Sequence, residues 1–155
     1  MVLNDAQYKA VWDRVYDTLH FAPSVDPAVV PFEFPVPHVV FDIRDAWDRM
    51  DEEAITAAML RCLQKGEKLY ALDWQHDCFL VDLTEHFEAW RENAFFTYPE
   101  YYPDGDYYFF IDEQFRFGYL GHPWRQEVWI FGECLIAEFE ALYSQLGWTK
   151  KEVVS

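Results

Sequence analysis

The chain has 155 residues and a mass of 18.6 kDa, which is the size of one ordinary domain. Hydrophobic residues make up 52% of it and aromatic residues 20%, a content that excludes intrinsic disorder because it can bury a core. The formal net charge is −16, from 12 Lys and Arg against 28 Asp and Glu. This charge opposes direct binding to nucleic acid or to a membrane surface, and it favours a basic partner.

The first residues and the cysteines bear on the compartment. Met1 to Asp5 show no basic segment leading into an apolar one, and no later run approaches the ~20 apolar residues of a membrane span. Cys62, Cys78 and Cys134 are odd in number and lack the short spacings of zinc motifs. We therefore expect neither a disulfide framework nor a metal site, and interpret the three as buried thiols of a cytoplasmic protein.

The first half of the chain predicts helices separated by an extended segment. Apolar residues up to Leu19 recur with helical spacing, whereas the prolines that follow fix φ, remove backbone donors and exclude a helix. A β-branched run and a second amphipathic stretch come next, and Gly66 supplies a stop. The expected elements are a helix over 8–19 with Asn4 or Asp5 as N-cap, an extended strap over 21–37, a strand over 38–43 and a helix over 51–66.

The second half predicts mainly strands. Short apolar and aromatic runs are separated by turn signals such as Pro103-Asp104-Gly105, where Pro presets φ and Gly accepts a positive φ. The expected strands cover 69–74, 78–82, 107–111, 115–120 and 127–131, and the expected helices cover 84–91 and 133–146. We predict a single α+β domain over residues 1–150, with an antiparallel meander sheet covered by N- and C-terminal helices, and a C-terminal tail over 151–155.

Three segments are dense in rare residue types: LDWQHDCF at 72–79, YPDGDYYFF at 102–110 and FGYLGHPW at 117–124. With the FGECLI that follows at 131–136, they resemble a bacterial family of unknown function, DUF2716. The resemblance implies bacterial origin and a one-domain architecture. It implies no catalytic residue, because no activity of the family is established.

The polar residues of these segments offer one reading as a small enzyme. His76 and His122 lie at turns with aspartates near them, so they could act as acid and base or as metal ligands beside Asp73 or Asp106. Their spacing matches no metal motif, and each imidazole has a bland explanation as a hydrogen-bonding group that fixes its own turn. We therefore expect no metal or other cofactor, and keep this site, between the DWQHD and GHPW turns, as the alternative.

Nucleophilic and phosphate-binding motifs give little support to an enzyme. Cys78 lies two residues from His76 and shares its face if both are in one strand, but a cysteine in an apolar run is usually a small buried hydrophobe. The sequence contains no GxSxG elbow and no glycine-rich phosphate loop.

The preferred hypothesis rests on a surface that interleaves tyrosines with carboxylates. Tyr concentrates binding energy at interfaces and carboxylates steer cationic partners; the alternative, weighed evenly, is that this loop only caps the core. We predict an acidic protein-binding module, most concretely a bacterial immunity protein that occludes the active site of a basic toxin; the aromatic content also permits a homo-oligomer. The candidate partner-binding residues are Glu92, Tyr98, Glu100, Tyr101, Tyr102, Asp104 and Asp106.

Overall fold

The computed structural model describes residues 1–34, 36–46, 50–83 and 99–154 of the chain. In these residues one antiparallel sheet has the strand order β3-β2-β4-β5-β6-β1-β7. The strands are β1 (His38–Asp42), β2 (Leu69–Asp73), β3 (Phe79–Val81), β4 (Tyr108–Asp112), β5 (Gly118–His122), β6 (Glu127–Phe131) and β7 (Thr149–Val154). The helices are α1 (Asp5–Leu19), α2 (Glu52–Arg61), α4 (Glu133–Leu142) and the short 3-10 helix η1 (Arg44–Ala46).

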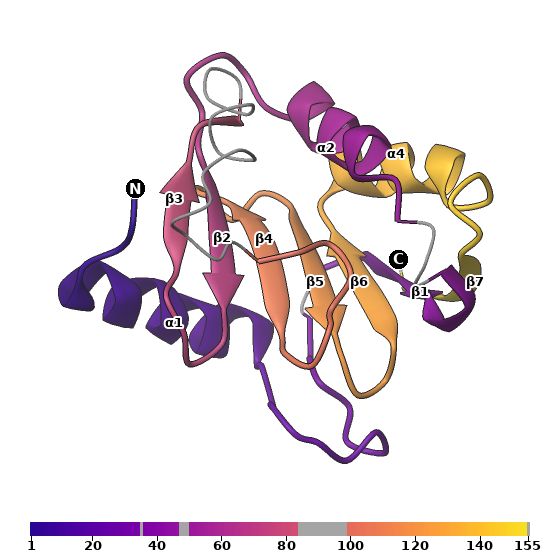
Figure 1. Cartoon of the computed structure of the whole chain (residues 1–155), viewed down its shortest axis with the longest axis horizontal. Coiled ribbons are helices and arrows are strands. Elements are labelled where there is room, and N and C mark those ends of the chain that lie inside the picture. Colours follow the sequence, from indigo (N-terminus) through magenta and orange to yellow (C-terminus); the bar gives the residue numbers. More distant parts are fainter. Residues whose placement is uncertain (35, 47–49, 84–98, 155) are drawn as a thin grey trace.

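The helices cover both faces of the sheet (Figure 1). On one face α1 and the proline-rich strap bury an aromatic core around Trp12, Phe21 and Phe109. On the other face α2 and α4 lie together over a second core, which includes Tyr119 and Phe139. The alternation of side chains along each strand feeds both cores, so the predicted α+β single domain with its meander β4-β5-β6 is confirmed.

Local chemistry explains where the first helix begins and ends. Asn4 and Gln7 form a capping box in which each side-chain oxygen accepts the other residue's backbone N–H, both at 2.9 Å. His20 adopts a left-handed conformation with φ of 50° and closes the helix, as predicted from the loss of helical spacing after Leu19. No helix in the described part of the chain is long and apolar enough to cross a membrane.

Two expectations about the C-terminal half are wrong. The expected tail at 151–155 is not a tail, because residues up to Val154 belong to β7, which pairs with β1. The expected strand over 115–120 begins later, at Gly118, because Phe115 takes a positive φ of 56° in a turn that Asp112 stabilises by accepting hydrogen bonds from Arg116. The helix expected over 84–91 lies outside the described residues.

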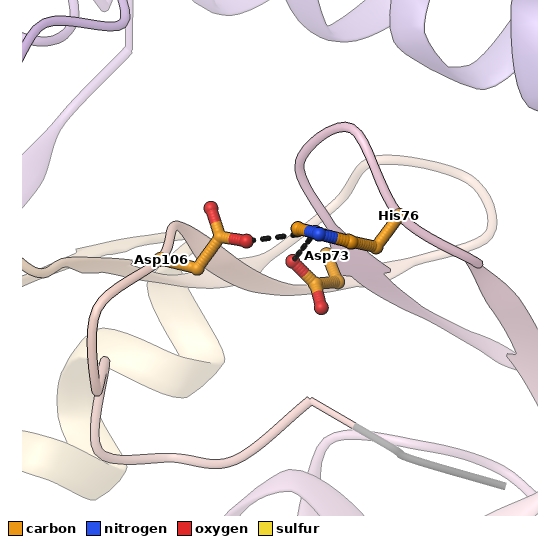
Figure 2. A group of neighbouring side chains, drawn as sticks. All are labelled: Asp73, His76 and Asp106. Carbon is orange, nitrogen blue, oxygen red and sulfur yellow. Dashed lines mark hydrogen bonds and ion pairs between the residues drawn. The ribbon is translucent and has the colours of Figure 1, made fainter.

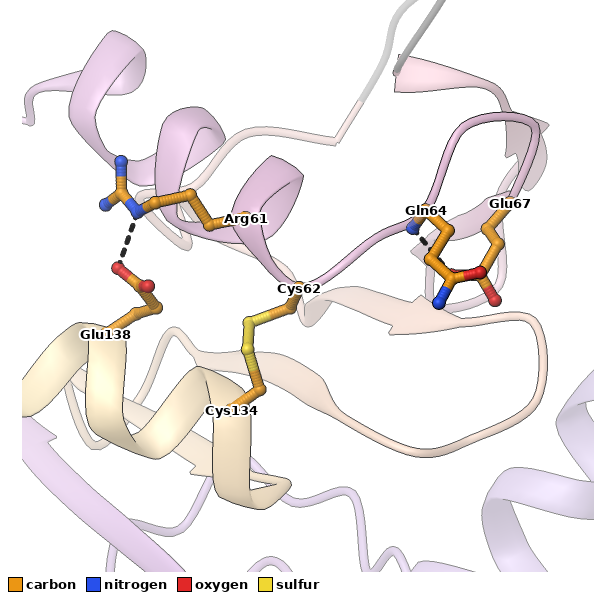
Figure 3. The surroundings of a disulfide bond; sticks show 6 residues. All are labelled: Arg61, Cys62, Gln64, Glu67, Cys134 and Glu138. Atoms are coloured by element: carbon orange, nitrogen blue, oxygen red, sulfur yellow. Dashed lines mark hydrogen bonds and ion pairs between the residues drawn. A yellow bond between two sulfur atoms is a disulfide. The ribbon is translucent and has the colours of Figure 1, made fainter.

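Two of the three cysteines form a disulfide, contrary to expectation. Cys62 is the C-cap of α2 and Cys134 lies in the first turn of α4, and the two helices lie side by side (Figure 3). An ion pair beside it, Arg61 Nε to Glu138 Oε2 at 2.7 Å, joins the same helices. The two cysteines are 72 residues apart in the sequence, so no local pattern predicts that they are close in the fold. Cys78 is a buried free thiol, as expected.

Candidate functional site

Three side chains from the DWQHD and DGD segments converge at one end of the sheet (Figure 2). Asp73 is the last residue of β2, and its pairing with Tyr108 of β4 brings the turn before β4 alongside it. The backbone N–H of Trp74 donates to the Tyr107 carbonyl at 3.2 Å and holds the two segments together. Antiparallel pairing therefore brings Asp106 close to Asp73, which is 33 positions away in the sequence.

The imidazole of His76 lies between the two carboxylates. Its Nδ1 is 3.1 Å from Asp73 Oδ1 and 2.8 Å from Asp106 Oδ2. The side chain of Asp73 is 12% exposed and that of Asp106 is 19% exposed, whereas 66% of the His76 side chain is exposed. The two carboxylates of the cluster are thus largely buried, and the imidazole is exposed to solvent.

Burial and mutual repulsion perturb the ionisation of this cluster. Desolvation raises the pKa of Asp73 to about 7; the hydrogen bond and charge of Asp106 act in the same direction, and His76 opposes them. The pKa of His76 is raised in turn, first by its hydrogen bond to Asp73 and then by the negative charges nearby. Asp73 therefore exchanges its proton near neutral pH, which is the range in which proton transfer is useful.

His122 does not join this cluster in its contacts. Its side chain is fully buried, with Nδ1 accepting the backbone N–H groups of Trp124 and Arg125, both at 3.2 Å, and Nε2 lying 3.4 Å from the Tyr107 hydroxyl. The Tyr107 hydroxyl in turn donates to the Ser24 carbonyl at 2.5 Å. The ring therefore stabilises its own turn, which is the structural role that the sequence offered as an alternative to catalysis.

The buried imidazole of His122 predicts a loss of stability in mild acid. Burial lowers its pKa to about 4; the charge of Glu127 opposes this shift and that of Arg125 adds to it. Unfolded chain binds this proton below pH ~6.5 and folded chain does not, so the free energy of unfolding falls as the pH drops from about 6.5 to about 4, by up to about 3 kcal/mol. Urea unfolding of wild type and His122→Asn across this range measures it. The variant should lose this part of the pH dependence. If the free energy of unfolding changes with pH equally in both proteins, His122 is not its source.

Cys78 is unsuited to act as a nucleophile. Its thiol is buried, and desolvation raises its pKa to about 11. Its Sγ donates to the carbonyl oxygens of Asp73 and His76, both at 3.5 Å, so it supports the turn that carries the cluster. The structure thus favours the reading of Cys78 as a small buried residue.

The residues expected to bind a partner divide into three groups. Glu92 and Tyr98 lie outside the described residues. Tyr101 is only 5% exposed and its hydroxyl forms a 2.5 Å hydrogen bond with Thr56 Oγ1 in the core, yet it also lines the hollow beside Glu100, so its role as a contact residue stays a prediction. Those that remain at the surface or are half-buried are Glu100, Tyr102, Asp104 and Asp106.

An acidic hollow of about 500 Å³ lies beside these residues. Its lining includes Glu52, Glu100, Tyr102 and Asp104. Desolvation raises the pKa of Glu100, and the nearby charges of Asp104 and Glu52 raise it further. Glu52 comes from the first turn of α2, where an acidic residue also complements the helix dipole.

Tyr108, the first residue of β4, is within range of the charges of both the hollow and the histidine cluster. Its pKa is raised to about 12, first by desolvation and then by the charges of four aspartates and glutamates. They are Asp73, Asp106, Glu100 and Asp104. Both groups of carboxylates therefore contribute to one electronegative end of the sheet.

A buried ion cluster that no sequence motif predicts lies on the other face of the sheet. Glu127 is fully buried in β6, and its carboxylate accepts hydrogen bonds from Arg125, Lys151 and the Trp129 indole. Burial acts to raise its pKa, but these donors outweigh it and lower the pKa. The cluster fastens β7 to the sheet and offers no exposed chemistry.

Comparison with known proteins shows to which family the chain belongs. Residues 2–136 match the model of a family described as protein of unknown function DUF2716. The chain belongs to this family. It is similar to the uncharacterized protein YxiI of Bacillus subtilis (strain 168), at 31% identity over 151 residues that cover 86% of this chain and 88% of that protein. No solved structure matches it.

In this DUF2716 protein the three segments that carry the resemblance lie on adjacent strands. LDWQHDCF spans the turn from β2 to β3, YPDGDYYFF leads into β4, and FGYLGHPW contains β5. The first two segments supply the whole histidine cluster, and the third supplies His122. Adjacent strands thus carry the residues that the sequence singled out, at one end of the sheet.

Proposed function

We propose that this DUF2716 protein is an acidic protein-binding module that captures a basic partner, most concretely an immunity protein that occludes the active site of a bacterial toxin in the cytoplasm. The observation that carries the proposal is the acidic hollow, where Glu100 and Asp104 are exposed beside the half-buried ring of Tyr102. Carboxylates around an aromatic residue suit the lysines and arginines with which a nuclease holds its substrate.

The charge of the whole chain supports the same partner. A net charge of −16 on a small domain attracts a basic protein at long range, and the hollow concentrates that field on one surface. Tyr102 is held in place because its hydroxyl donates to Gln126 Oε1. A positioned ring loses little conformational freedom on binding, so it can lengthen the lifetime of a complex that the carboxylates bring together.

The enzyme alternative receives less support from the structure. It joined His76 to His122 in one site, but the contacts of His122 are with Tyr107 and with the backbone of its own turn. His76 with its two aspartates is a separate group of side chains, whose chemistry does not require His122.

Removing two charges at the hollow tests the surface. We expect Glu100→Gln with Asp104→Asn to weaken binding of the cognate toxin domain about tenfold, mainly through slower association, and to reduce its salt dependence. Surface plasmon resonance at two ionic strengths measures both quantities.

Asp17→Asn with Glu33→Gln is the matched control, since it removes two exposed charges at α1 and the strap, on the opposite face of the sheet. Equal weakening by both pairs would show that only the total charge matters and would contradict the assignment of this surface. Unchanged binding by both pairs would contradict it as well.

The immunity role has a test that does not depend on these variants. We expect the gene to lie directly beside one for a large secreted toxin, and co-expression of this chain to restore growth to cells producing the toxin domain. A position within a metabolic operon, or no protection from the neighbouring toxin, would overturn the immunity role.

A further inference from the structure

The cluster of Asp73, His76 and Asp106 has the donor atoms of a metal site that the proposed function does not use. We propose that it binds one zinc ion, through Oδ1 of Asp73, Nδ1 of His76 and Oδ2 of Asp106. These residues come from the end of β2, the β2–β3 turn and the turn before β4, so the site exists only in the folded chain.

The spacing of the donor atoms suits a transition metal. The two distances from Nδ1 to the carboxylate oxygens are 3.1 Å and 2.8 Å, and one donor atom from each of the three residues lies within 4.8 Å of the others. Bonds of about 2.0 Å in a tetrahedral site place neighbouring donors about 3.3 Å apart. Small rotations of the side chains therefore fit the group to zinc without a change in the backbone.

The charge of the site provides an observation independent of that spacing. Both carboxylates are largely buried, and in the described part of the chain neither forms an ion pair with a lysine or an arginine. His76 supplies at most one positive charge, so the group carries a net negative charge once both carboxylates are ionised. A divalent cation satisfies both carboxylates at once, which a single imidazolium cannot do.

Neighbouring groups hold the ligands in place. The second oxygen of Asp106, Oδ1, accepts the backbone N–H of Tyr107 at 2.8 Å, which leaves Oδ2 turned toward His76. The thiol of Cys78 contacts the carbonyls of Asp73 and His76, and Gln75 has a positive φ of 68° in the turn between them. The exposure of His76 leaves the remaining coordination position to water.

The imidazole decides which ions the site prefers. Two carboxylates alone suit magnesium or calcium, but a nitrogen ligand favours zinc and its transition-metal neighbours. Zinc coordinates an unprotonated ring nitrogen and ionised carboxylates, so zinc ions and protons compete for these atoms. Zinc binding should accordingly become tighter as the pH rises. Because the buffer takes up the released protons, the measured heat of binding should depend on the buffer used.

Calorimetric titration of metal-free full-length protein with zinc chloride tests the site. We expect one equivalent to bind, magnesium and calcium at the same concentration to give no signal, and cobalt(II) to show the visible spectrum of a low-coordinate site. His76→Gln and Asp106→Asn should each weaken zinc binding about 100-fold. Because His76 is exposed, its variant is expected to fold, which thermal unfolding checks.

Asp77→Asn is the matched control, because this exposed neighbour of His76 is outside the cluster. It should bind zinc as wild type does. Two results would overturn the site. One is that the wild type binds zinc no more tightly than His76→Gln does, and the other is that Asp77→Asn loses as much zinc affinity as His76→Gln. Either result leaves the toxin-binding proposal intact, since that proposal is tested at Glu100 and Asp104.

Discussion

Loss of the Cys62–Cys134 bond is expected to lower the free energy of unfolding by about 4 kcal/mol, because the bond closes a loop of some 72 residues in the unfolded chain. Cys62 is half-buried and Cys134 is exposed, so replacing both by serine creates no large cavity and the change reports chiefly on the cross-link. Urea unfolding of wild type and of Cys62→Ser/Cys134→Ser under non-reducing conditions measures it.

Reduced wild type is the control for this prediction. With a reductant present, both proteins should unfold at the same urea concentration, since neither then holds the bond. Thiol titration of the denatured, non-reduced wild type should find one free thiol, that of Cys78. Three free thiols, or equal stability of the two proteins without reductant, would contradict the bond.

The same bond bears on the proposed compartment. Persistent disulfides are typical of oxidising environments, and cytosolic ones are usually transient, catalytic or redox-sensing. Cys62 and Cys134 therefore do not indicate a reducing compartment, and Cys78 is the one cysteine that remains a free thiol. Trapping thiols in growing cells decides the matter: a reduced pair is compatible with an immunity protein that acts in the cytoplasm, and a fully oxidised pair contradicts that location.

Periodic patterns explain which elements could be predicted from the sequence. β6 was predicted at 127–131 and occurs there, because its apolar run is bounded by turn residues on both sides. α1 follows from one apolar stripe and a capping residue. Phe115 and Phe117 misled the prediction of β5, since an aromatic run has high strand propensity even where Asp112 and Arg116 hold it in a turn.

Long-range pairing explains what could not be predicted at the site. Asp73, His76 and Asp106 were all candidates, but only the pairing of β2 with β4 shows that they meet while His122 does not join them. Tyr101 and Tyr102 are adjacent in the sequence and both line the hollow, yet Tyr101 is buried in the core and Tyr102 is half-buried. The disulfide likewise depends on two helices lying on one face, which no short motif records.

Gly132→Ala is expected to lower the free energy of unfolding by about 3–5 kcal/mol, combining a strained backbone with overpacking. Gly132 joins β6 to α4 with a φ of +94°. A β-carbon there would lie 2.4 Å from Phe117 Cβ and 2.5 Å from the Arg116 carbonyl oxygen, and the second of these atoms belongs to the backbone and cannot turn aside. The start of α4 must therefore move away from the turn that precedes β5.

Gly66→Ala separates the two causes, because Gly66 also has a positive φ, of +86°, but its β-carbon would meet no atom within 4 Å. We expect this control to cost about 1–2 kcal/mol, the strain alone, so the difference between the variants measures the close approach of the 116–117 backbone. Urea unfolding with unchanged m-values provides the comparison. Equal losses would mean that β6 and α4 meet less closely than the structure shows, and that the FGECLI segment needs its glycine only for backbone conformation.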